Sequence, residues 1–492
     1  MLGLYPAEVV RRAEESLIEQ VPQGSLMQIA ARGLATHCLR LMREVRGSIS
    51  GTRVAVLIGT GNNGGDALFA GAYLQSRGMA VTAVPVSDSW HIEGMQALLR
   101  AGGQRASLAE FDEFLYEVEV IIDGIVGIGA HGGLREPAAS LIRAVNRADA
   151  LRIAVDLPSG VNTDDGAVTS VAFDADSTVT FGCYKPGLFL HPGRSHAGAV
   201  HLIDIGLDPE LPEPTMRVID LVDVATVLAP PAVADHKYRR GVVGIAAGST
   251  TYPGAAALAV GSARYAGVGM VRFLDRGDGL AARVVTAFPD VVADPRDARS
   301  DDRVRAWGCG PGFTEADEQT VAMIISEPTP IVLDAGALHC IASSDELRSG
   351  IRARVDQGLT TVLTPHEGEY LRLFGEQQPI EVAATWGAIV VRKGPATTIT
   401  SPDGVVFVDP MGTADLAYAG SGDVLTGLMA GLLAANPDSD PAEVAAAAVW
   451  LHGLCGRIAA AGERPVAGVD ISAALPHAIA AVRTGNLAGW QL

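Results

Sequence analysis

A glycine-rich octapeptide, Gly59–Asp66 with the sequence GTGNNGGD, directly follows the apolar run Arg53–Ile58. An apolar run that leads into a glycine turn is typical of a strand-to-helix junction in a parallel α/β sheet. The glycines at 59, 61 and 64 match the G-x-G-x-x-G spacing of dinucleotide-binding turns. Asn62, Asn63 and Asp66 do not suit such a turn, because it favours small or apolar residues where the helix packs on the sheet. Their oxygens favour a cation, or a ligand bound through its hydroxyl groups.

The composition restricts the class of protein. The chain has 492 residues, which is enough for two or three domains. Its 37 Lys and Arg against 56 Asp and Glu give a formal net charge of −19. Such a surface repels phosphate backbones, so we expect no nucleic-acid partner. The five cysteines lie far apart without a C-x-x-C pair, a pattern typical of free thiols in a reducing compartment.

We expect a cytoplasmic protein without a membrane span. Residues 8–15 carry five charged side chains on a helical pattern, which does not fit a secretory signal. The uncharged stretch 241–263 is interrupted by Gly, Pro, Ser, Thr and Tyr, unlike a transmembrane helix. The expected partners are small-molecule substrates, and the expected assembly is a homo-oligomer.

Short apolar runs alternate with helical patterns in both halves, which predicts two α/β domains with mostly parallel sheets covered on both faces. In the first half the predicted strands are Val54–Ile58, Val81–Val86, Val118–Asp123, Arg152–Asp156, Thr178–Phe181 and Val200–Ile205, and the first predicted helix is Asp66–Arg77. In the second half the predicted strands are Val242–Ala246, Met270–Leu274, Val304–Trp307, Ile331–Asp334, Thr361–Leu363 and Ile389–Arg392. A proline-rich segment between them has weak periodicity and predicts a linker. We therefore predict domains at 1–210 and 235–492, joined by a linker at 211–234.

Three predicted strands of the first half lead into polar residues. The first precedes Asn62–Asp66, the second ends at Asp123 before Gly127–Gly133, and the third ends at Asp156 before Leu-Pro-Ser159-Gly. Ligands of open parallel sheets lie at the carboxyl ends of the strands, so these residues are expected in one site. A single Asp at a strand end is often only a cap or a turn former. Three together can form an oxygen cage for a monovalent cation beside a ligand pocket.

In order and approximate spacing, these segments and the helical segment Gln28–Ala35 resemble the NAD(P)H-hydrate epimerases over about residues 8–206. The resemblance implies a Rossmann-like three-layer domain, K⁺ bound by Asn63, Asp123 and Ser159, and a catalytic Asp156. The implied contacts to the hydrated nicotinamide nucleotide are Asn62, Asn63, Gly64, Gly65, Asp66, Gly127, Ile128, Gly129, Ala130, His131, Gly132, Gly133 and Asp156. Thr60 stands where the family has proline and Ala67 where it has glycine. Neither change removes a ligand oxygen, so we expect at most a reshaped loop.

In the second half, Gly420–Asp423 opens the apolar helical run 424–433. Such a turn directs free N–H groups and the positive end of the helix dipole at one point, which suits an anion. Asp423 there suits a base that acts on an attacking hydroxyl, although alone it could equally be an N-terminal cap. Lys393–Thr397 and His366 each follow a predicted strand. A lone histidine is more often structural, yet this place makes His366 a candidate ligand contact.

This half resembles the ribokinase-like fold and, within it, the ADP-dependent NAD(P)H-hydrate dehydratases, over about residues 235–485. The resemblance includes His236–Gly241, Asp334–Leu338 and Leu451–Gly453. It implies ADP as co-substrate, Mg²⁺, and a catalytic Asp423. The implied nucleotide contacts are Lys393, Gly394, Pro395, Ala396, Thr397, Gly420, Ser421 and Gly422, and the implied hydrate contacts are Ala255, Gly312, His366 and Asp423. Departures from the family pattern are Ser421 for threonine, Gly336 for aspartate, Arg392 for leucine, and Phe313 after Gly-Pro-Gly.

Together the two resemblances imply repair of a nicotinamide nucleotide that has been damaged by hydration. One domain would interconvert the R and S hydrates, and the other would dehydrate the S form with ADP, releasing AMP and phosphate. Three other interpretations were weighed. A small-molecule or vitamin kinase would give a stable phosphorylated product, and a scaffold would lack turnover. A dehydrogenase would use Asp88 to bind a ribose, which leaves the polar loop and the second domain without a role.

Overall fold

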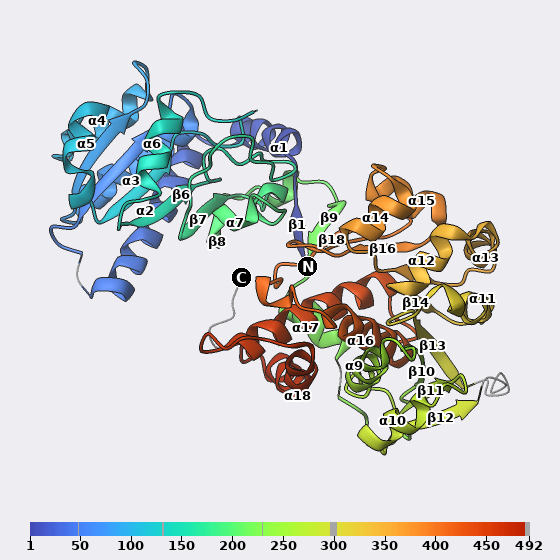
Figure 1. Cartoon of the computed structure of the whole chain (residues 1–492). Helices are drawn as coiled ribbons and strands as arrows, with labels where there is room; N and C mark the ends of the chain where they lie inside the picture. Colours follow the sequence, from blue (N-terminus) through green and yellow to red (C-terminus); the bar gives the residue numbers. More distant parts are fainter. Residues whose placement is uncertain (48, 130–131, 229, 296–302, 488–492) are drawn as a thin grey trace. The chain divides into compact units, whose positions relative to one another are not determined.

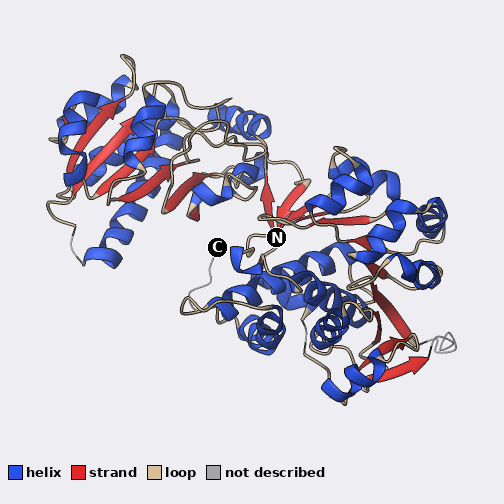
Figure 2. Cartoon of the chain, viewed as in Figure 1, coloured by secondary structure: helices blue, strands red, loops and turns tan. Residues whose placement is uncertain are grey.

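The computed structural model describes residues 1–47, 49–129, 132–228, 230–295 and 303–487. The chain divides into two compact units, a smaller one of Gly3–Pro214 and a larger one of Met1–Leu2 with Thr215–Leu492. Each unit is built around one mostly parallel sheet with helices packed on it (Figure 1, Figure 2). Within the described ranges, no helix is both long and apolar enough to cross a membrane.

The smaller unit has a seven-stranded parallel sheet in the order β4-β3-β2-β5-β6-β7-β8. Its strands are β2 (Arg53–Ile58), β3 (Ala80–Pro85), β4 (Gln104–Arg105), β5 (Val120–Gly124), β6 (Leu151–Val155), β7 (Ser177–Phe181) and β8 (Ala199–Ile203). All six strands predicted for this half are confirmed, with ends displaced by at most two residues. Buried β-branched runs identify them, because strands covered on both faces are almost continuously apolar.

Two apolar cores cover the two faces of this sheet. Val54, Val56 and Ile58 of β2 pack with α1 to α4, whereas Ala55 and Leu57 pack with α5 and α6. This division follows from the twofold side-chain alternation of a strand. The helices are α1 (Ala7–Gln20), α2 (Ser25–Arg46), α3 (Asn62–Ser76), α4 (Ile92–Arg100), α5 (Leu108–Phe114), α6 (Ala138–Val145) and the short α7 (Arg194–Ala197).

The larger unit has an eleven-stranded sheet in the order β1-β9-β18-β17-β16-β15-β14-β13-β10-β11-β12. The strands from β16 to β12 in this order are parallel, and β17 is antiparallel to both of its neighbours. Its strands are β1 (Leu2–Leu4), β9 (Met216–Val218), β10 (Val242–Ala246), β11 (Met270–Asp275), β12 (Val292–Pro295), β13 (Val304–Cys309), β14 (Ile331–Leu333), β15 (Thr361–Leu363), β16 (Ile389–Arg392), β17 (Thr398–Thr400) and β18 (Val406–Val408). The six strands predicted for this half are confirmed.

Helices cover both faces of the larger sheet. One core includes α8, α9, α10, α16, α17 and α18, and the other includes α11 to α15. Helices α9 and α16 lie side by side although they are far apart in the chain (Figure 1). A Cβ at Gly427 would lie 1.9 Å from the Ala259 carbonyl oxygen, so a glycine permits this approach. The helices are α8 (Leu221–Val227), α9 (Pro253–Ala263), α10 (Leu280–Ala287), α11 (Glu318–Ile325), α12 (Gly336–Ser343), α13 (Asp345–Asp356), α14 (Glu367–Phe374), α15 (Pro379–Trp386), α16 (Ser421–Ala435), α17 (Pro441–Ala460) and α18 (Gly468–Thr484).

Two segments differ from the sequence-based expectation. Helix α3 begins at Asn62 rather than Asp66, so the polar residues of the octapeptide form its first turn. The segment 211–234 is not a continuous linker, because β9 pairs with β18 and α8 carries a capping box between Asp220 and Asp223. The change of unit falls after Pro214. The prolines obscured a short strand that the sheet stabilises only through long-range pairing.

Candidate active sites at the two sheet edges

The carboxyl end of β5 in the smaller unit places Asp123 against Ser159. The Asp123 carboxylate accepts hydrogen bonds from the Ser159 hydroxyl and the Ser159 backbone N–H, both at 2.7 Å. Both residues are buried. Burial raises the pKa of Asp123 to about 6, although the hydrogen bonds from Ser159 oppose the shift. A buried carboxylate without a cationic side chain beside it is suited to a bound cation.

Asn63, in the first turn of α3, reaches the same place. A Cβ at Gly127 would lie 3.2 Å from the Asn63 side-chain amide, so the amide lies against the loop that follows β5. The Asn63 Nδ2 atom is buried and has no hydrogen-bond partner in the described part of the chain. Val126 N–H donates to the Ser159 hydroxyl at 3.0 Å, which links that loop to Ser159. Asn63, Asp123 and Ser159 therefore surround one polar spot whose oxygen donors fit a monovalent cation.

Asp156 follows β6 and pairs with a lysine that the sequence analysis did not single out. The Lys185 ammonium donates to Asp156 Oδ1 at 2.6 Å, and also to the Thr180 hydroxyl at 2.9 Å. The Lys185 side chain is 1% exposed. Asp156 has a φ of +65°, a backbone conformation that residues other than glycine rarely adopt. Residues with such strained backbone angles are common at functional sites. The backbone thus holds Asp156 in an unfavourable conformation that the buried lysine pair stabilises.

A cavity of about 310 Å³ lies at this edge, lined by Glu14 from α1 and by Asn62 and Asp66 from α3. Burial and the nearby charge of Asp156 raise the pKa of Glu14 to about 7. The same two causes raise the pKa of Asp66 well above its usual value. Three carboxyl groups and one lysine ammonium therefore interact electrostatically around this cavity, as is common at functional sites.

The other residues expected in the first site take different places. Gly64 and Gly65 are buried in α3, whereas Gly129 lies in open space. The Ile128 carbonyl accepts a hydrogen bond from the Arg11 guanidinium at 2.9 Å, which ties the loop to α1. Gly132 and Gly133 follow in the same loop, while Ala130 and His131 lie outside the described residues. Direct contact of this loop with substrate stays a prediction.

The second site is assembled at the carboxyl ends of neighbouring strands in the larger unit. Following the sheet order from β10 through β13, β14, β15 and β16, the strand ends lead to Ser249, Gly312, Asp334, His366 and Lys393. The N-terminus of α16 reaches the same edge, since a Cβ at Gly422 would lie 3.3 Å from the Lys393 nitrogen. The sheet thus brings together residues that are far apart in sequence, from Ser249 to Lys393.

Asp334 is the polar centre of this edge. Lys393 Nζ donates to Asp334 Oδ1 at 2.6 Å, and the Thr426 hydroxyl donates to Asp334 Oδ2 at 2.7 Å. Asp334 is 1% exposed. The pair orients the Lys393 ammonium toward the first turn of α16, where an anionic phosphate is expected.

Asp423 lies one residue beyond Gly422, in the first turn of α16, and is half-buried. Burial, and next the charge of Asp334, raise the pKa of Asp423 to about 6, while Lys393 opposes the shift. No hydrogen bond from a side chain or backbone group to the Asp423 carboxylate is found among the described residues, so it does not act as a helix cap. A half-buried carboxylate whose pKa approaches neutrality is suited to general-base catalysis. Ser421 is held instead by His452, whose Nε2 lies 3.0 Å from the Ser421 carbonyl oxygen.

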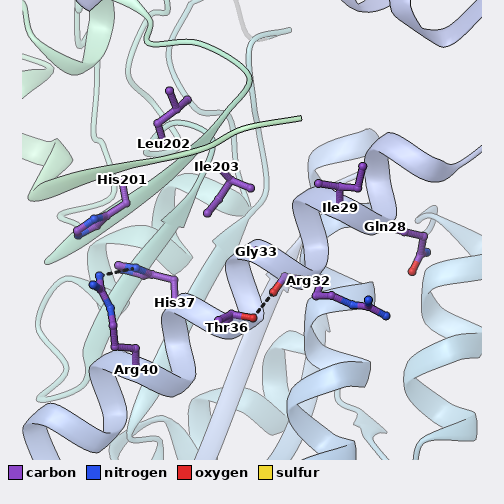
Figure 3. A pocket seen from close by; sticks show the side chains of 10 residues that line it. All are labelled: Gln28, Ile29, Arg32, Gly33, Thr36, His37, Arg40, His201, Leu202 and Ile203. Atoms are coloured by element: carbon purple, nitrogen blue, oxygen red, sulfur yellow. Dashed lines mark hydrogen bonds between the residues drawn. The ribbon is translucent and has the colours of Figure 1, made fainter. Parts of the chain in front are cut away.

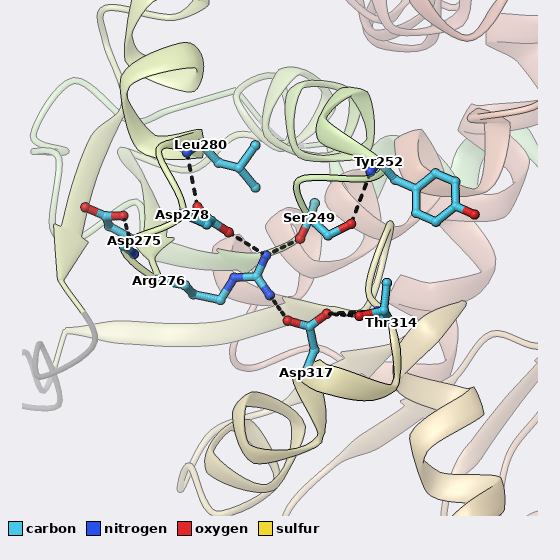
Figure 4. A network of polar contacts seen from close by, with 10 residues as sticks. Ser249, Tyr252, Asp275, Arg276, Asp278, Leu280, Thr314 and Asp317 are labelled. Carbon is cyan, nitrogen blue, oxygen red and sulfur yellow. Dashed lines mark hydrogen bonds and ion pairs between the residues drawn. The ribbon is translucent and has the colours of Figure 1, made fainter.

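Arg276, a buried residue that follows β11, holds several loops together at this edge of the larger sheet (Figure 4). The Arg276 guanidinium bonds to the Gly248 carbonyl and to Asp317, donates to Asp278 at 3.0 Å, and lies 4.6 Å from the centre of the Phe313 ring. The Gly248 N–H donates to the Pro311 carbonyl at 2.7 Å, so the loops after β10 and β13 are joined. These loops carry the predicted hydrate contacts: a Cβ at Gly312 would lie 2.7 Å from the Ala255 Cβ. Arg276 therefore fixes the distance between Ala255 and Gly312.

His366 has a structural role in addition to its place at the edge. Its Nδ1 accepts hydrogen bonds from the backbone N–H groups of Gly368 and Glu369, and it caps α14. Its side chain is 61% exposed, and its Nε2 lies 3.5 Å from the Glu369 carboxylate. Gly394, Pro395, Ala396 and Thr397 form the turn between β16 and β17, closed by the Gly394 N–H and the Thr397 hydroxyl at 3.3 Å. Their contact with a nucleotide stays a prediction.

The departures from the family pattern have local explanations. A Cβ at Gly336 would lie 2.4 Å from the Phe313 carbonyl oxygen, so these two departures are neighbours and each accommodates the other. Arg392 forms a two-pronged ion pair with Glu367, at 2.8 and 2.9 Å. Ala67 lies inside α3, where its Cβ occupies the space beside Gly124, so the expected reshaping of the loop does not arise from it.

Sequence reasoning missed Lys185, Glu14, Thr426 and Arg276, and did not assign a role to Asp334. Lys185 and Asp334 each follow a predicted strand, and that position was an available signal. Glu14 lies in the amphipathic helix α1 and Thr426 in the apolar helix α16. The neighbouring sequence of a polar residue inside a helix does not indicate a catalytic or binding role. Arg276 follows β11, but Asp275–Asp278 looks like an ordinary charged turn.

Comparisons with known proteins cover both units. A family described as YjeF-related protein N-terminus matches residues 23–187, and one described as NAD(P)H-hydrate dehydratase matches residues 243–477. The bifunctional NAD(P)H-hydrate repair enzyme of Mycobacterium tuberculosis is 38% identical over 452 residues, covering 90% of this chain and 91% of the relative. That of Mycobacterium leprae is 36% identical over 494 residues, covering 98% and 99%. A crystal structure of the ADP/ATP-dependent NAD(P)H-hydrate dehydratase from Bacillus subtilis, with ATP and Mg²⁺, is 27% identical with a TM-score of 0.46, covering 54% of this chain and 98% of that one.

Proposed function

This chain belongs to the family of bifunctional NAD(P)H-hydrate repair enzymes, and we propose how its residues divide the two reactions. The protein joins an epimerase that interconverts the hydrates with a dehydratase that restores NAD(P)H. We assign epimerisation to the edge at Asp156 and dehydration to the edge at Asp423. The observation that carries this assignment is that each family match contains one complete set of strand-end polar residues.

We propose epimerisation by ring opening: the hydroxyl loses its proton and becomes a carbonyl while the adjacent ring C–N bond breaks and the nitrogen takes up a proton, and the reverse steps close the ring on the opposite face. Asp156 is the group that accepts and returns the hydroxyl proton, and Lys185 donates a hydrogen bond to its carboxylate at 2.6 Å. Glu14 and Asp66, whose pKa values are raised, are the neighbouring carboxyl groups that can donate a proton. Asn62 and the loop Gly127–Gly133 hold the nucleotide.

Asn63, Asp123 and Ser159 would hold potassium through oxygen atoms, namely the Asn63 amide oxygen, the buried Asp123 carboxylate and the Ser159 hydroxyl. The bound ion would supply a fixed positive charge next to the substrate's phosphates. Removing potassium should raise the KM for the hydrate more than it lowers kcat. We also place the protein in the cytoplasm, where its five buried free cysteines stay reduced.

Dehydration needs a better leaving group than hydroxide. Asp423 takes the proton of the substrate hydroxyl, and the hydroxyl oxygen attacks the β-phosphorus of ADP while the bond to the α-phosphate breaks and AMP leaves. The new phosphate ester then eliminates across the ring, losing phosphate and the proton on the neighbouring carbon, which restores the dihydronicotinamide. Lys393 and the N-terminus of α16, with Gly420, Ser421 and Gly422, bind the transferred phosphate. A stereospecific site of this kind acts on the S hydrate alone.

The described side chains at this edge do not form a binding site for magnesium. Among the described residues no group of three His, Cys, Asp or Glu side chains could hold a metal ion. Both Asp334 oxygens accept hydrogen bonds from Lys393 and Thr426. We therefore route no chemical step through a protein-bound magnesium ion. The phosphates of the nucleotide are the ligands that remain for it.

The assignment is tested by supplying each hydrate separately. With ADP, the wild-type protein should restore the near-ultraviolet absorbance of reduced nicotinamide from the R and from the S hydrate. Asp156→Asn should process the S hydrate and leave the R hydrate untouched apart from its spontaneous epimerisation. Equal loss of both activities in that variant would contradict the assignment. Replacing ADP by ATP in the same assay decides the nucleotide preference.

The interpretations weighed against repair do not account for the whole chain. A kinase would accumulate a phosphorylated substrate, which chromatography of the same reaction detects. A scaffold in the smaller unit would not need the strained, lysine-paired Asp156. For a dehydrogenase, Asp88 would have to bind a ribose, yet it is exposed after β3 and apart from the residues that line the 310 Å³ cavity.

A further inference from the structure

A second cavity, of about 700 Å³, lies between α2 and β8 in the smaller unit (Figure 3). Strand β8 is the edge strand of its sheet, so this cavity borders the side of the strand that no other strand covers. Its lining includes Arg32 and Arg40 from α2, together with His37 and His201. Asp123, Asp156 and Ser159 do not line it, so it is separate from the catalytic edge.

The charge of this cavity is opposite to that of the protein. The chain carries a formal net charge of −19, yet no Asp or Glu lines the cavity. Arg32 and Arg40 are exposed, and neither forms an ion pair within the residues that the structure describes. Unpaired guanidinium groups in one concave surface are suited to anionic ligands, and to phosphate in particular.

A chain of hydrogen bonds orients Arg40. The Ser177 hydroxyl donates to the Ala199 carbonyl at 3.1 Å, so it accepts from His37 Nε2 at 2.9 Å. His37 Nδ1 is then the acceptor for Arg40 Nη2, at 3.2 Å. The pKa of His37 is lowered to about 3 by its burial, and then by His201 and Arg40. His37 is therefore a neutral acceptor for the Arg40 guanidinium, whose other N–H groups donate to none of the residues that the structure describes.

The separation of the two arginines favours a ligand larger than a free ion. Arg32 and Arg40 are eight residues apart on α2, about 12 Å along the helix axis, and their side chains point to opposite ends of the cavity (Figure 3). The apolar side chain of Ile203 lies between them in the view, and Ile29 lies beside Arg32 (Figure 3). We propose that this cavity is a binding site for a phosphorylated metabolite of nucleotide size. The phosphate would bind one guanidinium, and the rest of the ligand would lie on the apolar surface and reach the other arginine.

The test is calorimetric titration with AMP as the probe, using three proteins. Arg32→Gln/Arg40→Gln removes both charges, and Arg43→Gln is the matched control, since Arg43 is exposed on the same helix and does not line the cavity. Wild type and Arg43→Gln should bind AMP at one more site per chain than the double variant. The loss of affinity should be about tenfold for each guanidinium removed. Equal stoichiometry and affinity in all three proteins would overturn the proposal.

Two further probes separate the phosphate from the rest of the ligand. Inorganic phosphate and adenosine should each bind this site at least about tenfold more weakly than AMP. If adenosine binds as tightly as AMP, the guanidinium groups do not recognise a phosphate and the proposal is wrong. It is also overturned if the wild type has no additional site and the double variant changes the oligomeric state, because the face is then an interface between copies. Epimerase activity and the thermal transition should be unchanged in the double variant, which shows that it is folded and that the catalytic edge is intact.

Discussion

Both units place a lysine ammonium 2.6 Å from an aspartate carboxylate at the carboxyl ends of parallel strands, but the two lysines act on different partners. In the smaller unit Lys185 binds Asp156, the proposed catalytic group itself. In the larger unit Lys393 donates its hydrogen bond to Asp334 and acts on Asp423, the proposed base, only through its nearby charge. The first arrangement binds the reactive carboxylate directly to a buried ammonium, and in the second arrangement burial and the charge of Asp334 raise the pKa of Asp423 to about 6. The same kind of ion pair can therefore include the catalytic carboxylate or a neighbouring one.

The largest effect is expected from Asp423→Asn, which removes the base and keeps its shape. Dehydration should slow by about a thousandfold, within the range of general-base contributions. Epimerisation should be unchanged, because it depends on the other unit. The measurement is ADP-dependent recovery of reduced nicotinamide, with chromatographic separation of the R and S hydrates as control. Retention of more than about a tenth of the dehydration rate would show that Asp423 is not the base.

Lys185→Met should have the next largest effect, because it leaves the buried Asp156 carboxylate without its partner. Epimerisation should fall by about a hundredfold. The free energy of unfolding of the smaller unit should drop by about 3–5 kcal/mol, as is typical when one member of a buried pair is removed. Denaturant unfolding measures the second effect. The double variant Lys185→Met/Asp156→Leu should recover most of that stability without activity, and a double variant as unstable as the single one contradicts the pairing.

The pH dependence of dehydration should follow Asp423. A general base must be deprotonated, and its pKa of about 6 lies above the usual aspartate value, so activity is present above pH 6 and is lost as the pH falls through it. Below pH 6, kcat/KM should fall by about tenfold per pH unit. Initial rates between pH 5 and 8 give this profile. A plateau that extends to pH 5 would mean that the base titrates at a lower pH than Asp423.

Arg276→Lys should have the smallest effect. Lysine keeps the charge but loses the fork that holds the Gly248 carbonyl and Asp317 together, and it loses the planar contact with Phe313. The KM for the hydrate should rise by about fivefold, with kcat and the KM for ADP close to the wild-type values. A change confined to kcat would place Arg276 at the reacting atoms instead of beside the binding loops.

The strands were predictable because they are buried on both faces and therefore continuously apolar, as in Val54–Ile58 and Val242–Ala246. The strands β9, β17 and β18 were not predictable, because they have three residues each and are only partly buried. The equally short β14 and β15 were predictable, because they are buried throughout. The start of α3 was placed four residues late. Asn62, Asn63, Gly64 and Gly65 have low helix propensity, yet a Cβ at Gly64 would lie 2.7 Å from the Gly59 carbonyl oxygen, so the tight start of this helix needs a glycine there.

The candidate sites were predictable where function follows a strand end, as for Asp123, Asp156 and Lys393. The partners were harder to find, because a residue such as Glu14 meets Asp156 only after a helix folds across the sheet edge. Departures from a family pattern were also uninformative one by one. Gly336 and Phe313 make sense only as a contacting pair, and a sequence does not show that they touch.

The first strand of the chain belongs to the sheet of the larger unit. Met1–Leu2 group with residues from Thr215 onward, β1 lies beside β9, and the Met1 amino group bonds to Asp220 and Asp223. In chain topology the smaller unit is thus an insertion near one end of the larger one. During synthesis, the smaller unit can fold before β1 pairs with β9, because β9 and the rest of the larger unit are synthesised later. A fragment that starts at residue 215 would lack β1 and would expose β9 as a new sheet edge. Expressing the dehydratase unit alone therefore requires that the β1 segment be fused to it.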